Sequence, residues 1–246
     1  MKILAIEASG PVAGCALMED DILRAEYSIQ DKMKHSRTLV PMMEEIRGRL
    51  ELDLAEIDAV AVTKGPGSFT GLRIGAATAK GLGLALEKPL IPVPTVDCIA
   101  WNLYGTDSLV CPLMDARRQQ VYTGIYECRE SLRVLLPQRA AALTEILDRI
   151  NALGRRVIFL GDGVPVNRKA LDEETRVPYS FAPAHLSRQK PGTLADLAMR
   201  MYLEQGEACF VSADDFRPEY LRQSQAERER GDKRSYSLLV ETDQKK

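Results

Sequence analysis

Histidine is scarce in this chain, and its scarcity limits the kinds of active site that the sequence can encode. The 246 residues contain two histidines, His35 and His185, which lie 150 positions apart. Imidazole is a preferred zinc ligand and the commonest general base. The sequence therefore argues against a histidine-based metal site. It also lacks the G-x-S-x-G spacing of a serine nucleophile elbow.

Paired cysteines, long apolar runs and a strong net charge are missing as well. The five cysteines are odd in number, widely spaced and without a C-x-x-C pair, which is typical of core residues in a reducing compartment. The apolar run at residues 3–6 is too short for a signal segment or a membrane span. A net charge of −2 creates no overall field toward nucleic acid or anionic lipid. We expect a soluble cytoplasmic protein with no membrane partner.

The first hundred residues predict an antiparallel three-stranded meander followed by alternating helices and strands. Short apolar stretches between turn residues indicate strands at 3–8, 13–18 and 22–28. The spacing of Leu39, Met43, Ile46 and Leu50 predicts a helix. Ser36 and Thr38 are the candidate caps, and Thr38 fits better because Pro41 then falls in the first turn. Further along, the patterns predict a strand at 59–63, a helix at 70–86 and a strand at 90–93.

A second series repeats this order after a break near residues 100–108. Strands are predicted at 109–114, 120–126, 132–136, 157–160 and 177–181, with helices at 140–152, between the last two strands, and at 193–204. Each series begins with consecutive strands and continues with alternating helices and strands. Because this order occurs twice, the sequence predicts an α/β protein of two related lobes. We place the N-terminal lobe at 1–104, the C-terminal lobe at 105–222 and a charged tail at 223–246.

Residues 65–75, GPGSFTGLRIG, join a buried strand to a helix through a glycine-rich loop. Such a loop can present backbone N–H groups to an anion. The spacing matches neither the G-x-x-x-x-G-K-[ST] loop nor a convincing G-x-G-x-x-G, so a structural turn is the competing interpretation.

The helix after this loop carries a stripe of small residues. Gly71, Gly75, Ala79 and Gly83 recur every four positions. Each glycine costs a helix about 0.8–1 kcal/mol relative to alanine, so close approach of another element is the expected compensation. The sequence leaves two candidates for that element: the protein's own sheet, or another helix of this chain or a partner. We interpret the stripe as a docking face.

The loop and helix, GPGSFTGLRIGAATAKGLGLA, resemble the signature of the TsaB (YeaZ) family. This family supplies the non-catalytic subunit in bacterial synthesis of N6-threonylcarbamoyladenosine on tRNA, and it is related to the TsaD, or glycoprotease-like, family. The stretches ILAIEAS, HSRTLVPMM, DARRQQVY and FRPEYLR agree in order, so the likeness covers most of residues 1–222. The resemblance implies two RNase H-like lobes of the acetate and sugar kinase, Hsp70 and actin fold.

The resemblance also implies partners and an interface. It predicts a non-catalytic subunit that binds a TsaD-type catalytic protein, works with a TsaE-type ATPase and contacts tRNA only indirectly. A separate enzyme makes the threonylcarbamoyl-adenylate, and the chain can form a homodimer when the partner is absent. The predicted partner interface lies on two helices and comprises Leu39, Met42, Met43, Ile46, Leu50, Leu72, Gly75, Ala76 and Ala79.

The same resemblance predicts no metal and no catalytic residue in this chain. The H-x-x-x-H pair of TsaD proteins would fall on Thr95 and Ile99, and isoleucine cannot hold a metal. Kinases of this fold use an acid at the end of the first strand of each lobe, where this chain has Glu7 and Asp115. The family usually has Asp at the first position, and the extra methylene shifts a carboxylate by about 1.5 Å, so we favour a structural role for Glu7.

Two other functions stay open at this stage. One is an enzyme acting alone, a nucleotide-binding phosphotransferase or a metallopeptidase-like protein. The other is a module that holds ATP or ADP weakly, or only within the complex, with no cofactor of its own. The candidate anion or nucleotide contacts are Gly65, Gly67, Ser68, Glu7 and Asp115.

Overall fold

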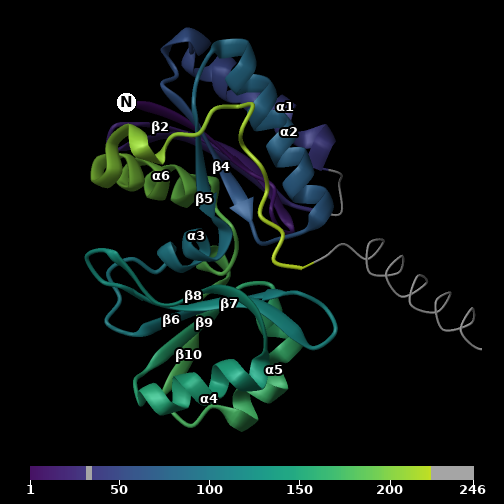
Figure 1. Cartoon of the computed structure of the whole chain (residues 1–246), viewed down its shortest axis with the longest axis vertical. Helices are drawn as coiled ribbons and strands as arrows, with labels where there is room; N and C mark the ends of the chain where they lie inside the picture. The colour runs from purple at the N-terminus through teal and green to yellow at the C-terminus, as the bar shows by residue number, and fades with distance from the viewer. Residues whose placement is uncertain (32–34, 223–246) are drawn as a thin grey trace, which may run out of the picture.

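Two five-stranded sheets with the same strand order form the body of the protein (Figure 1). The computed structural model describes residues 1–31 and 35–222. The first sheet has the order β3-β2-β1-β4-β5 and the second the order β10-β9-β6-β7-β8. When the second sheet is read from its β8 edge, the strands occur in the order third, second, first, fourth and fifth, counted along the chain of that lobe. The first sheet has this same order. Because each lobe has the same topology, the structure confirms the repeated α/β lobes.

The first sheet begins with the predicted meander. Its strands are β1 (Lys2–Glu7), β2 (Val12–Glu19), β3 (Ile22–Gln30), β4 (Ala59–Gly65) and β5 (Leu90–Pro94). The first three pair antiparallel, while β4 joins β1 and β5 joins β4 in parallel. Strands β1 and β2 are buried along nearly their whole length because helices cover both faces of this sheet.

Helices α1 (His35–Leu50) and α2 (Phe69–Leu86) cover one face of the first sheet, and α6 (Pro191–Gln205) covers the other. Helix α1 begins three residues before the predicted cap, Thr38. The His35 ring is hydrogen-bonded to the Gly10 carbonyl at 2.8 Å, which holds the first turn against the β1–β2 turn. Pro41 consequently lies inside the helix, and the Thr38 hydroxyl donates back to the His35 carbonyl at 3.2 Å.

The second lobe is built in the same way. Its strands are β6 (Leu109–Asp115), β7 (Gln120–Cys128), β8 (Leu132–Ala142), β9 (Val157–Leu160) and β10 (Tyr179–Phe181), with helices α4 (Leu143–Leu153) and α5 (Gly163–Glu174). Strand β8 is longer than predicted, because Ala141 and Ala142 still pair with β7. The α4 helix therefore starts three residues after the predicted position.

Helix α3 (Thr95–Trp101) lies between the lobes and was not predicted. Six of its seven residues are buried, so it has no polar face and no amphipathic period. Its apolar side chains join one cluster that runs from the α6 face of the first sheet to Met114 and Tyr126 of the second. A shared core therefore connects the two lobes.

The chain returns to the first lobe after β10. The predicted C-terminal range, 105–222, includes helix α6, yet α6 packs on β1 and β2 of the first sheet. Val211 then pairs with Leu90 of β5, and residues 211–222 continue along this lobe. The predicted tail, 223–246, lies outside the described residues. Within the described ranges, no helix has both the length and the apolar character needed to cross a membrane.

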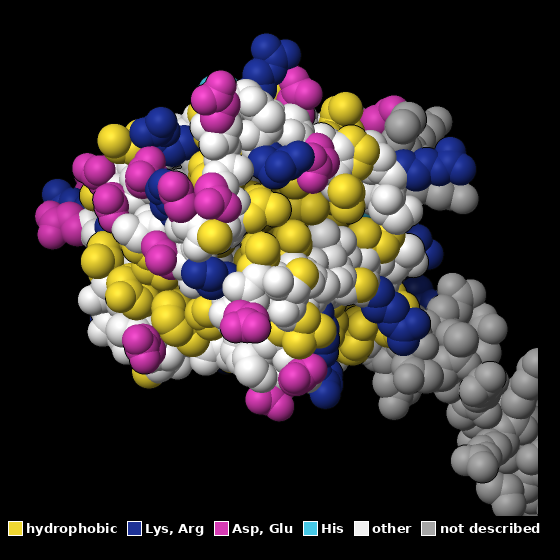
Figure 2. Space-filling model, turned by 90° about the horizontal axis from the view of Figure 1, so that it is seen from above, with side chains coloured by type: hydrophobic (Ala, Val, Ile, Leu, Met, Phe, Trp, Pro, Cys, Tyr) yellow, Lys and Arg dark blue, Asp and Glu magenta, His cyan; other side chains and the backbone are white. Residues whose placement is uncertain are grey.

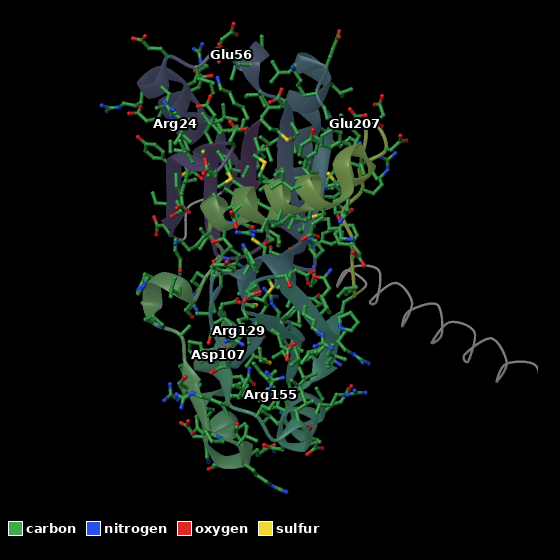
Figure 3. All side chains as sticks on the ribbon, turned by 90° about the vertical axis from the view of Figure 1, so that its left-hand side faces the viewer. Arg24, Glu56, Asp107, Arg129, Arg155 and Glu207 are labelled. Carbon is green, nitrogen blue, oxygen red and sulfur yellow. The ribbon has the colours of Figure 1, made fainter. Side chains whose placement is uncertain are left out.

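Charged side chains occupy the outside of both lobes (Figure 3). Arg24 and Glu56 lie at the far end of the first lobe, and Asp107 and Arg129 lie together in the second, joined at 3.0 Å. Ion pairs of this exposed kind contribute at most about 1 kcal/mol each. The apolar core between these surfaces accounts for most of the stability.

Candidate functional site: an interlobe cavity and an outer helix groove

A cavity of about 910 Å³ lies between the two lobes. Its lining residues come from segments 9–11, 67–72, 114–122 and 219–222, together with Asp162. These segments are turns that follow the carboxyl ends of β1, β4, β6 and β9, plus the last described residues. Ligands of open α/β sheets bind at such strand ends, so this cavity is the first candidate site.

The first-lobe wall of the cavity is closed by contacts that only glycine permits. A Cβ on Gly71 would overlap the carbonyl oxygen of Ala8, and one on Gly67 would overlap that of Ser9. The Ser68 amide donates to the Ser9 carbonyl at 2.7 Å, and the Ser68 hydroxyl caps α2 by accepting from the Gly71 amide at 3.4 Å. Of the predicted anion contacts here, Gly67 and Ser68 line the cavity.

Gly65 does not line the cavity. Its φ of +118° places it in a conformation that favours glycine, and the Glu219 carbonyl lies against it. Its function in this structure is to let residues 211–222 pass closely over the end of β4.

Glu7 also lies behind the cavity wall. Its side chain is buried at the end of β1, and Oε1 accepts from the Ser9 amide at 2.6 Å and the Ser9 hydroxyl at 2.5 Å. Oε2 has no partner among the described residues. Burial raises the pKa of Glu7 to about 7, against the opposing effect of the Ser9 hydrogen bonds. Glu7 thus holds the turn that forms the wall and does not reach the cavity.

The second-lobe wall is an exposed hairpin turn. Asp115 ends β6, lines the cavity and accepts from the Arg117 amide at 2.7 Å. Arg117, Arg118 and Gln119 have φ values of 60°, 54° and 60°. The left-handed conformation costs a non-glycine residue roughly 1–2 kcal/mol, so three in succession form a strained turn.

Asp162 forms the floor on the second-lobe side. It follows β9, and burial raises the pKa of its carboxyl while the nearby Arg188 lowers it. Its Oδ1 has no partner among the described residues. Sequence reasoning did not select Asp162, although its position after β9, between Gly161 and Gly163, is the kind of strand end that supplies ligand contacts.

Residues 211–222 form a strap that runs along the first lobe, and its last four residues, 219–222, line the cavity. The Glu219 amide donates to the Lys64 carbonyl at 2.6 Å, and Tyr220 packs on Phe69 with ring centroids 4.6 Å apart. At its end, Arg222 donates to the Ala116 and Arg117 carbonyls of the hairpin turn. The strap therefore connects the α2 N-terminus to the second lobe, a contact that the FRPEYLR stretch alone did not predict.

The predicted partner residues are mostly inside the molecule. Seven of the nine are buried: Leu39, Met42, Ile46, Leu72, Gly75, Ala76 and Ala79. The small stripe of α2 faces its own lobe, with Gly75 next to Ala8 and Val62, and Gly83 next to Leu90 and Ala213. The stripe therefore packs on this chain's own sheet and strap, which corrects its interpretation as a docking face. A helix must cover the apolar face of its sheet, and the small residues allow α2 to do so closely.

The outer surface of the same two helices is hollowed. A groove of about 260 Å³ between α1 and α2 is lined by apolar side chains, among them Val40 and Met43 of α1 and Leu82 of α2. Val40 is 53% exposed. Met43 and Leu50, the two remaining predicted residues, are half-buried, and Met43 lines the groove. Figure 2 shows the end of this lobe, where hydrophobic side chains gather in patches between charged ones.

Two glycines on this outer surface have no packing function among the described residues. Gly81 of α2 lines the groove and Gly48 of α1 is exposed, and a Cβ at either position would meet nothing within 4 Å. Since glycine weakens a helix, these positions are consistent with close approach from outside the chain.

The described residues do not assemble a metal centre. No three His, Cys, Asp or Glu side chains among them come together in a way that could hold an ion. Thr95 and Ile99, at the positions of the TsaD ligand pair, are both buried on α3. His185 is exposed in a short 3₁₀ turn, far in sequence from His35.

The fold and the site together define a class: a two-lobed α/β protein whose two sheets share one strand order. Its interlobe cavity is lined by main-chain turns and charged side chains. A family model described as "TsaD: tRNA N6-adenosine threonylcarbamoyltransferase" matches residues 25–230. The chain is 32% identical, over 92% of its length and 96% of the relative's, to the tRNA threonylcarbamoyladenosine biosynthesis protein TsaB of Bacillus subtilis. It is 34% identical to TsaB of Escherichia coli over 56% of its own length and 64% of that protein's.

Solved structures agree with this family. YeaZ from Pseudomonas aeruginosa superimposes with a TM-score of 0.71 and 23% identity, covering 89% of this chain and 99% of that one. A second Pseudomonas aeruginosa structure, described as similar to peptidase YEAZ, gives a TM-score of 0.76 and 24% identity, covering 90% and 99%. At these identities the structures establish the fold. With the sequence relatives, they lead to one conclusion: the chain belongs to the TsaB (YeaZ) family.

Proposed function

We propose that this protein acts in the synthesis of threonylcarbamoyladenosine on tRNA as a non-catalytic subunit in the cytoplasm, binding a TsaD-type catalytic protein. Its relatives carry the name of this pathway. The observation that carries the binding role is the groove between α1 and α2, which presents exposed Val40, adaptable Met43 and an unpacked helix glycine, Gly81.

The groove suits a partner helix better than a small ligand. It is apolar, lies between two helices, and has Glu44 and Arg47 among its lining residues. A protein interface combines an apolar centre with a polar rim in this way. The same surface supports self-pairing when the TsaD-type protein is absent, because a two-fold dimer uses one patch twice.

The test is a pair of substitutions at one position. Gly81→Arg fills the groove and should abolish co-elution with the TsaD-type protein in size-exclusion chromatography, whereas Gly81→Ala should retain it. Val166→Arg, at an exposed site on α5 of the second lobe, is the matched control. If the Gly81→Arg variant associates with the TsaD-type protein as the unaltered chain does, the groove is not part of the interface.

Reconstitution tests the pathway role itself. The TsaD-type protein, a TsaE-type ATPase and an enzyme that makes threonylcarbamoyl-adenylate should modify tRNA with this chain present and lose most of that activity without it. If the modification proceeds equally well without the chain, the proposed function is wrong.

A second candidate, a nucleotide-dependent enzyme acting alone, draws its support from the interlobe cavity. The α2 N-terminus and Asp115 face this cavity, as they would in a phosphotransferase. The floor, however, presents the carboxyl of Asp162, whose Oδ1 has no partner among the described residues and offers phosphate a hydrogen-bond acceptor rather than a donor. We therefore expect ATP and ADP to bind weakly or only within the complex. Calorimetry with both nucleotides and an ATPase assay of the isolated chain test this, and partner-free turnover would favour the enzyme.

A further inference from the structure

The strained turn at residues 115–119 holds its conformation through contacts on every side. The Ala116 amide donates to the Gln120 carbonyl at 3.0 Å, and the Gln120 amide to the Arg117 carbonyl at 3.2 Å. The Asp115 carboxylate accepts from the Arg117 amide, and the Arg222 guanidinium donates to the Ala116 carbonyl. Strain that the surrounding structure maintains in this way is concentrated at functional sites.

The effect of the turn is to present two arginines at the cavity rim without acidic partners. Arg117 and Arg118 are exposed and line the cavity, and across the described ranges neither forms an ion pair or a side-chain hydrogen bond. Arginines elsewhere in this lobe are often paired, as Arg129 is with Asp107 and Arg155 with Glu127 (Figure 3). Within the part of the chain that the structure describes, the rim therefore carries two cations without an acidic partner.

The acidic side chains around the cavity are outnumbered at this rim. Glu219 pairs with Lys64 at 3.1 Å, which leaves the Asp115 carboxylate against the guanidinium groups of Arg117, Arg118 and Arg222. Asp162 lies on the buried floor. The floor thus offers phosphate a carboxyl group, whereas the rim offers it guanidinium groups. This difference favours a strand lying across the mouth over a small nucleotide held deep inside.

The opposite rim supplies an aromatic surface. Tyr220 is 40% exposed and packs on Phe69, whose ring also carries the Arg73 guanidinium at 4.0 Å from its centroid. The amides of Phe69 and Thr70 lie in the first turn of α2, which has no helical acceptor for them. Aromatic faces beside cations and free amides are what an unpaired stretch of nucleic acid binds.

We propose that the rim formed by Arg117, Arg118, Phe69 and Tyr220 binds the phosphodiester backbone of RNA, with a base stacked on Tyr220. The inference rests on the proposed function, because the tRNA of that reaction supplies the strand. According to this proposal, the chain contacts RNA directly and not only through its partner. The contact depends on a local cluster of positive charge that the net charge of −2 does not reveal.

The test removes both charges without disturbing the turn. Glycine accepts the left-handed conformation of residues 117 and 118, so the double variant Arg117→Gly/Arg118→Gly should fold with an unchanged or raised Tm. Binding of fluorescently labelled tRNA is measured by anisotropy across a salt series, with the full chain alone and with the TsaD-type protein. We expect roughly tenfold weaker binding and a salt slope reduced by about two, as for the loss of two phosphate contacts.

Three further variants identify the cause. Arg149→Ala/Arg156→Ala removes two exposed arginines from the same lobe that have no ion pair among the described residues, and should bind tRNA like the unaltered protein. Arg117→Lys/Arg118→Lys keeps the charge and should keep the salt slope. Tyr220→Ala should weaken binding without changing the slope, because stacking releases no counterion.

Three results would overturn the proposal. One is equal tRNA affinity and slope for the glycine variant and the unaltered protein. Another is an equal loss in the Arg149→Ala/Arg156→Ala variant. The third is a glycine variant that loses ADP binding but not tRNA binding, which would assign the rim to free nucleotides. Co-elution with the TsaD-type protein is measured in the same samples. Its failure in the unaltered protein would refute the proposed function separately, because the RNA measurement on the chain alone does not depend on it.

Discussion

The two lobes end their first strands in opposite ways, although their sheets have the same strand order. In the first lobe the strand ends at Glu7, which is buried, and the following turn is closed by glycines packed against carbonyl oxygens. In the second lobe the corresponding strand ends at exposed Asp115, and the following turn places two arginines at the cavity rim that have no ion pair among the described residues. One topology thus provides a structural turn in one lobe and a charged, accessible turn in the other.

The largest effect is expected where the first-lobe turn is tightest. Gly71→Ala places a methyl group on the Ala8 carbonyl, which cannot move without shifting β1. We expect a loss of about 3 kcal/mol in the free energy of unfolding, at the upper end for overpacking. Urea unfolding measures it, and a loss below about 1 kcal/mol would mean that this turn is as tolerant as its counterpart in the second lobe.

The buried acid should make stability depend on pH. The pKa of Glu7 is raised from 4.5 to about 7 in the folded protein by burial. Between pH 4.5 and about 7 the carboxyl of Glu7 is ionised in the unfolded chain but protonated in the folded chain. The contribution of Glu7 to the free energy of unfolding is therefore complete below pH 4.5 and is lost as pH rises to about 7. The loss is on the order of 3 kcal/mol.

Glu7→Gln should abolish this slope, whereas Asp115→Asn should preserve it because Asp115 is exposed. Unfolding in urea at a series of pH values between 4 and 8 provides the comparison. A slope that persists in Glu7→Gln would assign the titration to another group.

A smaller, opposite effect is expected at the outer groove. Gly81→Ala adds a methyl group where nothing lies within 4 Å, so the isolated chain should gain about 0.8–1 kcal/mol in stability. Thermal unfolding measures it. A destabilised variant would show that α2 is packed on its outer side too, and would weaken the case for the groove as an interface.

The smallest effect concerns the strained turn. Arg118→Gly removes an unfavourable left-handed residue but gives the unfolded chain more freedom, so the net gain should be about 0.5 kcal/mol. The single variant Arg149→Ala serves as the control for loss of charge. A loss of stability in Arg118→Gly would show that the turn is not strained.

The sequence predicted the sheets well because alternating and apolar runs report directly on burial. The meander, the later strands of each lobe and most helices follow from local patterns. Helix α3 escaped detection because it is buried on nearly all sides and so has no period. The cap at Thr38 was misplaced because the contact that extends α1, between His35 and Gly10, joins residues 25 positions apart.

The site was harder to predict, because its residues meet only through the fold. Gly67, Ser68 and Asp115 were selected from the loop pattern and the family resemblance, and they do line one cavity. The pattern could not reveal that Gly65 and Glu7 lie behind the wall, or that Tyr220 and Arg222 return to close the mouth. From the sequence, the stripe of small residues on α2 could pack against its own sheet or against a partner. The contacts of Ala8 and Leu90 with the stripe show that it packs against its own sheet.

The return of the chain to the first lobe also has a consequence for the order of assembly during synthesis. All strands and helices of the second lobe are complete by residue 181, whereas α6, which covers one face of the first sheet, ends at residue 205. A chain that emerges from the ribosome from its N-terminus can therefore finish the second lobe while the first sheet still exposes apolar side chains on one face. The lobe that is translated first is the last to be completed, and a nascent chain stalled before α6 would be prone to aggregation.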